Sequence, residues 1–158
     1  IQWLDQKLAQ GCSILYVAFC SQAEVSVEQL QQIAMGSIVV KQWVDKRQIL
    51  KRQCVEGFLR HCGWNSALES ICYRVLILAW PMIAEQALNA RMVVEEFKVG
   101  RRVESTCNGM KPGFLKWERL MKMAKELMEG VMGKQVRKRV KEVAELAKMA
   151  MADSNGSF

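Results

Sequence analysis

Short apolar runs alternate with amphipathic segments through the first hundred residues of the chain. The runs occupy residues 12–19, 38–40, 57–59 and 75–79. Continuous runs of this length, rich in β-branched and aromatic residues, predict strands that are buried on both faces of a parallel sheet. One more short strand is expected at 100–103, at the edge of that sheet.

Between these runs, apolar residues recur at helical spacing. Ser26 begins a capping box for a helix that ends near Gly36. Further helices are expected at 45–50, from about Asn65, and from 85 to 97. Strand and helix therefore alternate, which predicts an α/β fold with a mostly parallel sheet flanked by helices.

Two amphipathic helices are expected after residue 111. The apolar face of the first carries Trp117, Leu120, Met121, Ala124, Leu127, Met128 and Val131. The apolar face of the second carries Val136, Val140, Val143, Ala147 and Ala150. The methionines of the first face indicate core packing rather than a ligand site.

Composition narrows the class of protein. The chain has 158 residues, of which 51% are apolar and 25% charged, as expected for one globular domain. Its apolar runs are too short for a membrane span. The first residues show neither an initiator Met nor a signal pattern, so we expect the inside of a longer protein. Six cysteines without C-x-x-C spacing, and His61 as the only histidine, predict free thiols in a reducing compartment and no metal site.

The net charge of +7 is concentrated late in the chain. Residues 111–148 hold 11 Lys or Arg and 5 Glu. This distribution is compatible with a nucleic-acid surface or with the solvated faces of two helices. Because aromatic residues are not interleaved with the charges, the second interpretation is favoured, and we expect neither a nucleic-acid nor a membrane partner.

The segment His61-Cys62-Gly63-Trp64-Asn65-Ser66 lies between an apolar run and a helix. A strand that ends in a Gly-containing turn and opens a helix can hold phosphate, because free N–H groups and the helix dipole face the anion. The alternative is an ordinary βα turn in which Ser66 and Glu69 form a capping box. Ligands of parallel sheets bind at the carboxyl ends of the strands. The loops at those ends carry residues 20–21, 43, 61–66 and 80–86.

Residues 43–86 resemble the signature box of the plant family 1 UDP-glycosyltransferases. The box begins with Trp43, continues with His-Cys-Gly-Trp-Asn-Ser and Glu69, and ends with Trp-Pro and Glu-Gln. The flanking segments fit as well. The resemblance therefore covers nearly the whole chain, but only the C-terminal, donor-binding half of a two-domain GT-B enzyme. It implies a Rossmann-like UDP-sugar-binding domain over residues 1–110, with a helical extension of the same domain at 111–158.

The resemblance implies a contact with UDP-sugar for each residue of the box. Trp43 would stack on uracil, the Val44 backbone would read the edge of the ring, and Glu69 would accept hydrogen bonds from the ribose. His61 would donate to the diphosphate. The remaining implied ligands are Ser21, Gly63, Trp64, Asn65 and Ser66 at the diphosphate, and Glu85 and Gln86 at the sugar.

The implied reaction is transfer of glucose from UDP-glucose to a hydroxyl of a small acceptor in plant secondary metabolism. We expect no metal and no cofactor beyond this co-substrate, a monomer, and a cytoplasmic location. The family's general base is a His in the N-terminal domain, whereas the role implied for His61 is phosphate binding. No catalytic residue is therefore assigned. The alternative is a non-catalytic truncated product that binds UDP weakly or not at all.

The chain departs from the family pattern at several positions. Lys46 stands where the family has a uracil-reading Gln, and Cys20 replaces a Gly. Arg60 replaces a Ser or Thr directly before His61. Gly36 runs directly into Ser37, where the family has a few tens of residues that include an interior strand. Loss of that strand predicts a sheet with two open edges or a re-paired sheet.

Overall fold

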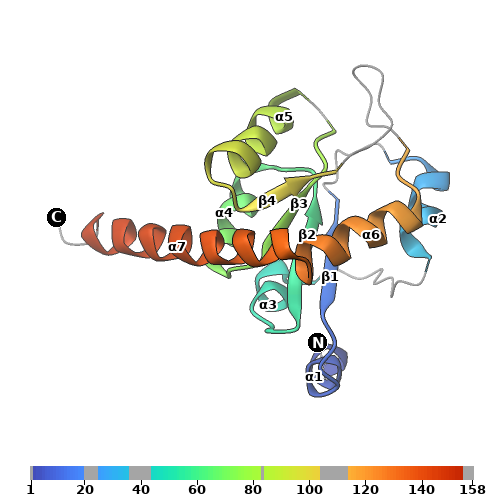
Figure 1. Ribbon diagram of the computed structural model, residues 1–158, viewed down its shortest axis with the longest axis horizontal. Helices are drawn as coiled ribbons and strands as arrows, with labels where there is room; N and C mark the ends of the chain where they lie inside the picture. The colour runs from blue at the N-terminus through green and yellow to red at the C-terminus, as the bar shows by residue number, and fades with distance from the viewer. Residues whose placement is uncertain (1, 20–24, 36–43, 83, 104–113, 155–158) are drawn as a thin grey trace.

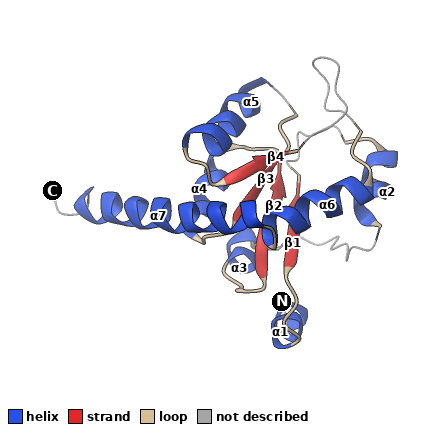
Figure 2. Ribbon diagram, viewed as in Figure 1, coloured by secondary structure: helices blue, strands red, loops and turns tan. Residues whose placement is uncertain are grey.

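The computed structural model describes residues 2–19, 25–35, 44–82, 84–103 and 114–154. Its sheet has four parallel strands in the order β1-β2-β3-β4 (Figure 2). The strands are β1 Ile14–Ala18, β2 Val55–Arg60, β3 Leu76–Ala79 and β4 Gly100–Arg102. The predicted α/β class is confirmed. The strand predicted at 38–40 lies outside the described residues.

Helices flank the sheet, and α6 and α7 cross in front of it in Figure 1. The helices are α1 Gln2–Ala9, α2 Val27–Ala34, α3 Lys46–Leu50, α4 Trp64–Cys72, α5 Ala84–Arg91, α6 Trp117–Met128 and α7 Val131–Ser154, with a π-helical turn η1 Met92–Glu96 after α5. The sequence pattern does not predict α1 or the π-helical turn. The predicted starts of two helices are confirmed by their caps: Ser26 Oγ accepts from Gln29 N at 3.2 Å, and Asp45 Oδ1 accepts from Arg47 N at 2.9 Å.

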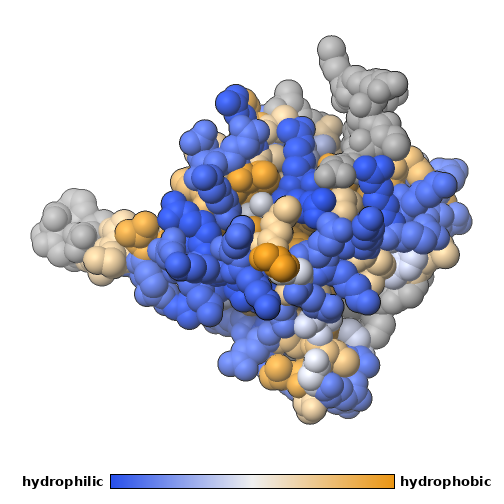
Figure 3. All heavy atoms as spheres, in the orientation of Figure 1, coloured by the Kyte–Doolittle hydropathy of each residue, from blue (hydrophilic) through white to orange (hydrophobic). Residues whose placement is uncertain are grey.

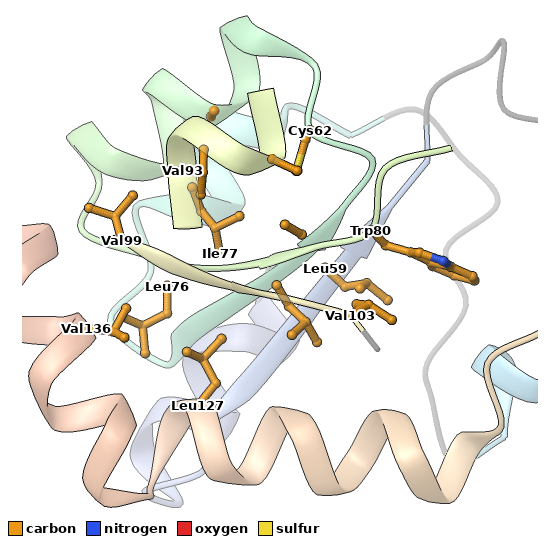
Figure 4. Close-up of a cluster of buried hydrophobic side chains, with 14 of the residues drawn as sticks. Leu59, Cys62, Leu76, Ile77, Trp80, Val93, Val99, Val103, Leu127 and Val136 are labelled. Atoms are coloured by element: carbon orange, nitrogen blue, oxygen red, sulfur yellow. The ribbon is translucent and has the colours of Figure 1, made fainter. Parts of the chain in front are cut away.

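Buried side chains lie on both sides of the central strands. Figure 4 shows Ile77 directed toward Val93 of η1, whereas Leu76 lies near Leu127 of α6 and Val136 of α7. All four residues of β3 are buried. The residues of β1 are only half-buried, because within the described part of the chain β1 pairs with β2 alone and forms an edge of the sheet.

The predicted core faces of the last two helices are partly wrong. Met121 is 37% exposed and Val131 is 77% exposed, while Met123 is buried. The helical phase is interrupted because α6 ends at Met128 and α7 begins at Val131. On α7 the buried apolar side chains among the described residues are Val136, Val140 and Ala144. Ala150 is exposed, since α7 continues past the sheet (Figure 1).

The face of the molecule that carries α6 and α7 is mostly hydrophilic (Figure 3). Among the described residues, no helix combines the length and apolar character needed to cross a membrane.

Candidate functional site

The predicted strand–turn–helix is present at the carboxyl end of β2. The strand ends at Arg60, and Gly63 is the N-cap of α4 but makes no side-chain capping hydrogen bond. Ser66 lies inside the first turn of α4, so it cannot cap the helix, and the capping-box interpretation is wrong. The first N–H groups of α4 therefore have no capping side chain, as an anion site requires.

The turn itself is held in an uncommon conformation. Cys62 has a φ of 66°, a left-handed conformation that non-glycine residues rarely adopt. Its carbonyl oxygen accepts from Asn89 Nδ2 of α5 at 3.0 Å, a contact that sequence reasoning missed because no local pattern links the two residues. The Cys62 thiol is fully buried, and burial raises its pKa to about 11. It is therefore protonated at neutral pH and is no nucleophile.

Gly63 makes room for the imidazole of His61. A Cβ at Gly63 would lie 3.0 Å from His61 Nε2. Burial lowers the pKa of His61, and the positive charges of Arg60 and Lys46 lower it further, so the ring is neutral at pH 7. Its Nδ1 is buried and has no hydrogen-bond partner among the described residues. A ring nitrogen is thus left without a protein partner at the opening of α4.

Lys46 joins two residues of the implied site. Its Nζ lies 2.5 Å from Glu69 Oε2 and donates to Ser66 Oγ at 2.7 Å. The Lys46 and Glu69 side chains are each 31% exposed. The Lys46 ammonium group therefore contacts both Glu69, which is implied to bind ribose, and Ser66, which is implied to bind phosphate.

Arg60 lies directly behind the turn and is 1% exposed. Its Nη2 donates to the Gly63 carbonyl oxygen, and its guanidinium carbon lies 5.4 Å from the centre of the Phe58 ring. Nε and Nη1 are buried without a hydrogen-bond partner among the described residues. Burial lowers the pKa of Arg60 to about 10, which leaves it charged at pH 7. Sequence reasoning noted this residue only as a departure from the family.

The other implied ligand residues differ in solvent exposure. Asn65, Trp64 and Glu85 are exposed, and the Trp64 ring lies 6.4 Å from the Phe97 ring. Gln86 is 6% exposed, and its Oε1 accepts from Met82 N at 3.0 Å.

Val44 is half-buried ahead of α3, while Ser21 and Trp43 lie outside the described residues. Among the residues that the structure does describe, no cluster of His, Cys, Asp or Glu could hold a metal ion. The described part of the site is thus a positively charged helix opening with one imidazole nitrogen that lacks a hydrogen-bond partner there and one buried guanidinium.

Comparison with known proteins agrees with the resemblance. The family model for UDP-glucoronosyl and UDP-glucosyl transferase matches residues 24–111, more than half of the chain. UDP-glycosyltransferase 90A1 of Arabidopsis thaliana is 47% identical over 188 aligned positions, which cover 99% of this chain and 39% of that protein. Isoflavone 7-O-glucosyltransferase 1 of Glycine max is 38% identical, with 81% of this chain and 26% of that protein covered.

A solved structure has the same fold. UGT2 of Phytolacca americana, complexed with UDP-2fluoro-glucose and pterostilbene, superposes with a TM-score of 0.79 at 31% identity, and the match covers 93% of this chain and 39% of that one. The match thus spans about two fifths of the length of the Arabidopsis and Phytolacca proteins and 26% of the Glycine max protein.

The alignment with the Arabidopsis protein is longer than this chain. It spans 188 positions, whereas this chain has 158 residues, so at least 30 of those positions (188 less 158) have no counterpart here. This size agrees with the segment of a few tens of residues expected between Gly36 and Ser37.

Proposed function

Because the chain belongs to the UDP-glucoronosyl and UDP-glucosyl transferase family, we propose that it is the UDP-sugar-binding half of a glycosyltransferase. One observation carries the proposal: among the described residues the buried Nδ1 of His61 has no hydrogen-bond partner, and the His61 ring lies against Gly63 at the uncapped opening of α4. Both features suit a diphosphate, which accepts hydrogen bonds and carries negative charge.

In this proposal UDP lies along the carboxyl ends of the strands. Its diphosphate lies at the opening of α4, its ribose at Glu69, and its uracil on Trp43. Asn65, Ser66, the Trp64 N–H and Ser21 complete the phosphate contacts, the Val44 backbone reads the uracil edge, and Glu85 and Gln86 hold the sugar. Glucose as the transferred sugar is supported by the names of related proteins, one of which is a glucosyltransferase, while another was solved with UDP-2fluoro-glucose.

The proposed chemistry is inverting transfer of the sugar to an acceptor hydroxyl. That reaction needs a general base for the acceptor proton and stabilisation of the negative charge on departing UDP. The helix opening supplies the second requirement. We assign no base in this chain, since His61 is its only histidine and lies at the proposed diphosphate. The base and the acceptor pocket are proposed to belong to the part of the relatives that this chain does not span.

Titration with UDP, by calorimetry or by thermal shift, tests the proposal. We expect saturable binding, weakened by the Lys46–Glu69 ion pair. His61→Ala should lower the affinity for UDP by roughly ten- to hundredfold, since a hydrogen bond to a charged group contributes about 1.5–3 kcal/mol. No response at millimolar UDP would overturn the proposal, and equal binding by His61→Ala would overturn the placement of the diphosphate.

The second candidate is a non-catalytic product that retains weak UDP binding, and the Lys46–Glu69 contact favours it. It predicts that the purified chain neither hydrolyses UDP-glucose nor glucosylates a small phenol. Either activity would contradict it.

We also propose a monomer that acts in the cytoplasm in plant secondary metabolism and needs no metal. The buried free thiols of Cys54 and Cys62 support a reducing compartment. The cationic side chains around the turn support metal-free binding, because they can offset the charge of a diphosphate. Addition of EDTA should therefore leave the UDP titration unchanged, and a loss of binding would contradict this part of the proposal.

A further inference from the structure

We propose that Arg60 is a built-in counter-charge for the diphosphate, fixed behind the turn, which stabilises bound UDP and destabilises the ligand-free chain. The inference rests on the proposed function. It concerns a position where the chain departs from the family pattern.

The position of the guanidinium is fixed by its surroundings. Nη2 donates to the carbonyl oxygen of Gly63, the N-cap of α4, and the group lies over the Phe58 ring. A Cβ at Gly63 would lie 3.7 Å from Nη2. The charge of Arg60 is therefore held immediately beneath the helix opening where the anion is proposed to bind.

Among the described residues, no carboxylate lies within ion-pair distance of this charge. Arg60 forms no ion pair within the described part of the chain, and its Nε and Nη1 are without hydrogen-bond partners there. The carboxylate of Glu69 favours the charge of Arg60 without forming an ion pair with it, and that carboxylate is already bound by Lys46. A buried ion without a partner is strongly unfavourable, so the ligand-free arrangement indicates an anion that is supplied from outside.

The neighbouring groups add to the same imbalance. Burial lowers the pKa of His61, and the positive charges of Arg60 and Lys46 lower it further, but of these two cations only Lys46 is paired with a carboxylate among the described residues. The opening of α4 carries the positive end of the helix dipole as well. The charge of Arg60 and the helix dipole are unfavourable to each other while the site is empty, and both favour a bound diphosphate. A fixed charge in a water-poor site is especially effective at stabilising a leaving group.

A purely structural role is the competing explanation, since Arg60 also supports the Gly63 carbonyl and covers Phe58. The two explanations differ in the sign of the effect on stability. Arg60→Met keeps the length of the side chain and removes the charge. A counter-charge role predicts that this variant unfolds at a higher urea concentration and binds UDP more weakly, whereas a structural role predicts loss of both stability and binding.

The experiment compares the wild-type chain, Arg60→Met, Arg60→Lys and a control, Arg47→Met, whose arginine is exposed on α3. We expect Arg60→Met to lower the affinity for UDP at least about tenfold, and the affinity for uridine, which lacks phosphate, by less than about twofold. Arg60→Lys should retain most of the affinity, and Arg47→Met all of it. Because His61 is the only histidine, one NMR titration reports the local potential, and its pKa should rise in Arg60→Met.

Unchanged UDP affinity in Arg60→Met would overturn the inference, as would equal losses for UDP and uridine or a lower urea midpoint. Failure of the wild-type chain to bind UDP would instead overturn the proposed function. Inorganic pyrophosphate then serves as the probe, followed by the same His61 resonance. A shift in the wild-type chain that Arg60→Met weakens would uphold the counter-charge, and the absence of any shift would overturn it too.

Discussion

Two regions of this molecule are rich in positive charge, and they differ in how that charge is paired. On α7, which lies on a mostly hydrophilic face of the molecule (Figure 3), several basic residues are paired with nearby carboxylates. The pairs there include Arg137–Glu56 at 2.6 Å, Arg139–Glu142 at 3.0 Å and Lys148–Glu145 at 3.4 Å. At the turn after β2, by contrast, the charge of Arg60 is buried and has no carboxylate partner in the described part of the chain.

The difference shows that a region with many charges does not necessarily contribute most to ligand binding. Exposed ion pairs contribute about 0–1 kcal/mol each, and their charges are screened by salt. A single buried cation acts without such screening. The net charge along the sequence would therefore suggest an anion-binding surface at residues 111–148. Burial and the lack of ion pairs suggest residues 60–66 instead. The predictions below test this contrast, from the largest expected effect to the smallest.

Gly63→Ala should disturb the turn strongly. Its new Cβ would lie 3.0 Å from His61 Nε2, so the ring must shift by a few tenths of an ångström beside the helix opening. We expect about a tenfold loss of UDP affinity, because small displacements of a binding group are costly, measured by calorimetry.

Gly11→Ala is the matched control for this substitution. Gly11 has a φ of +66° and open space around it, so Ala there should cost about 1 kcal/mol of stability and leave UDP binding unchanged. Equal affinity of Gly63→Ala and the wild-type chain would contradict the placement of His61 at the diphosphate.

Lys46→Gln should strengthen ribose binding. The substitution releases Glu69 and Ser66 from the Lys46 ammonium, so Glu69 can accept from both ribose hydroxyls. We expect the affinity for uridine to rise about threefold to tenfold, since the half-exposed ion pair that is lost is weak and the hydrogen bonds gained involve a charged group.

Lys51→Gln, at the other end of α3, is the control and should change nothing. A loss of UDP affinity in Lys46→Gln with unchanged uridine affinity would instead show that the ammonium binds the diphosphate.

The pH dependence of stability and of binding should have opposite signs. The pKa of His61 is lowered in the folded chain, so its contribution to stability is complete above the ordinary value of about 6.5 and is lost as pH falls below it. A bound diphosphate favours the protonated ring, so the affinity for UDP-glucose should rise over the same pH range.

UDP-glucose is the suitable ligand for this measurement because its diphosphate has no terminal group that titrates near pH 6. Urea unfolding and calorimetry between pH 8 and 5.5 give the two trends, and His61→Gln should abolish both. Parallel trends would contradict an imidazole that faces the anion.

Much of the fold could be predicted from local pattern alone. The run at 57–59 and the helix after it are fixed by periodicity and by a Gly-containing turn, and the structure confirms them as β2 and α4. Val131 was wrongly placed on the core face of the first helix, because the break at 129–130 resets the helical phase and Val131 begins α7. Met121 lies within α6, where the buried residues are Leu120, Met123, Ala124 and Leu127. A repeat that is read across such a break assigns residues to the wrong side.

The sequence predicts which residues form the site but not which of their side chains contact one another. The spacing and resemblance indicate which residues surround the turn. They do not reveal that Lys46 pairs with Glu69 and donates to Ser66. Nor do they reveal that Asn89 donates to the Cys62 carbonyl or that Arg60 is buried. Those contacts join residues of different elements, so they depend on tertiary packing and leave no periodic signal in the sequence.

The smallest effect is expected for charge removal on the exposed face of α7. Substituting Lys134, Lys141 and Lys148 together by Gln lowers the net charge from +7 to +4, and Gln has nearly the helix propensity of Lys. The three side chains are exposed, so we expect a change in the free energy of unfolding below about 1 kcal/mol and a UDP affinity within about twofold of the wild-type chain at 150 mM salt. If three exposed charges altered UDP binding more than Arg60→Met does, long-range attraction and not the buried guanidinium would account for binding, and the contrast between the two regions would fail.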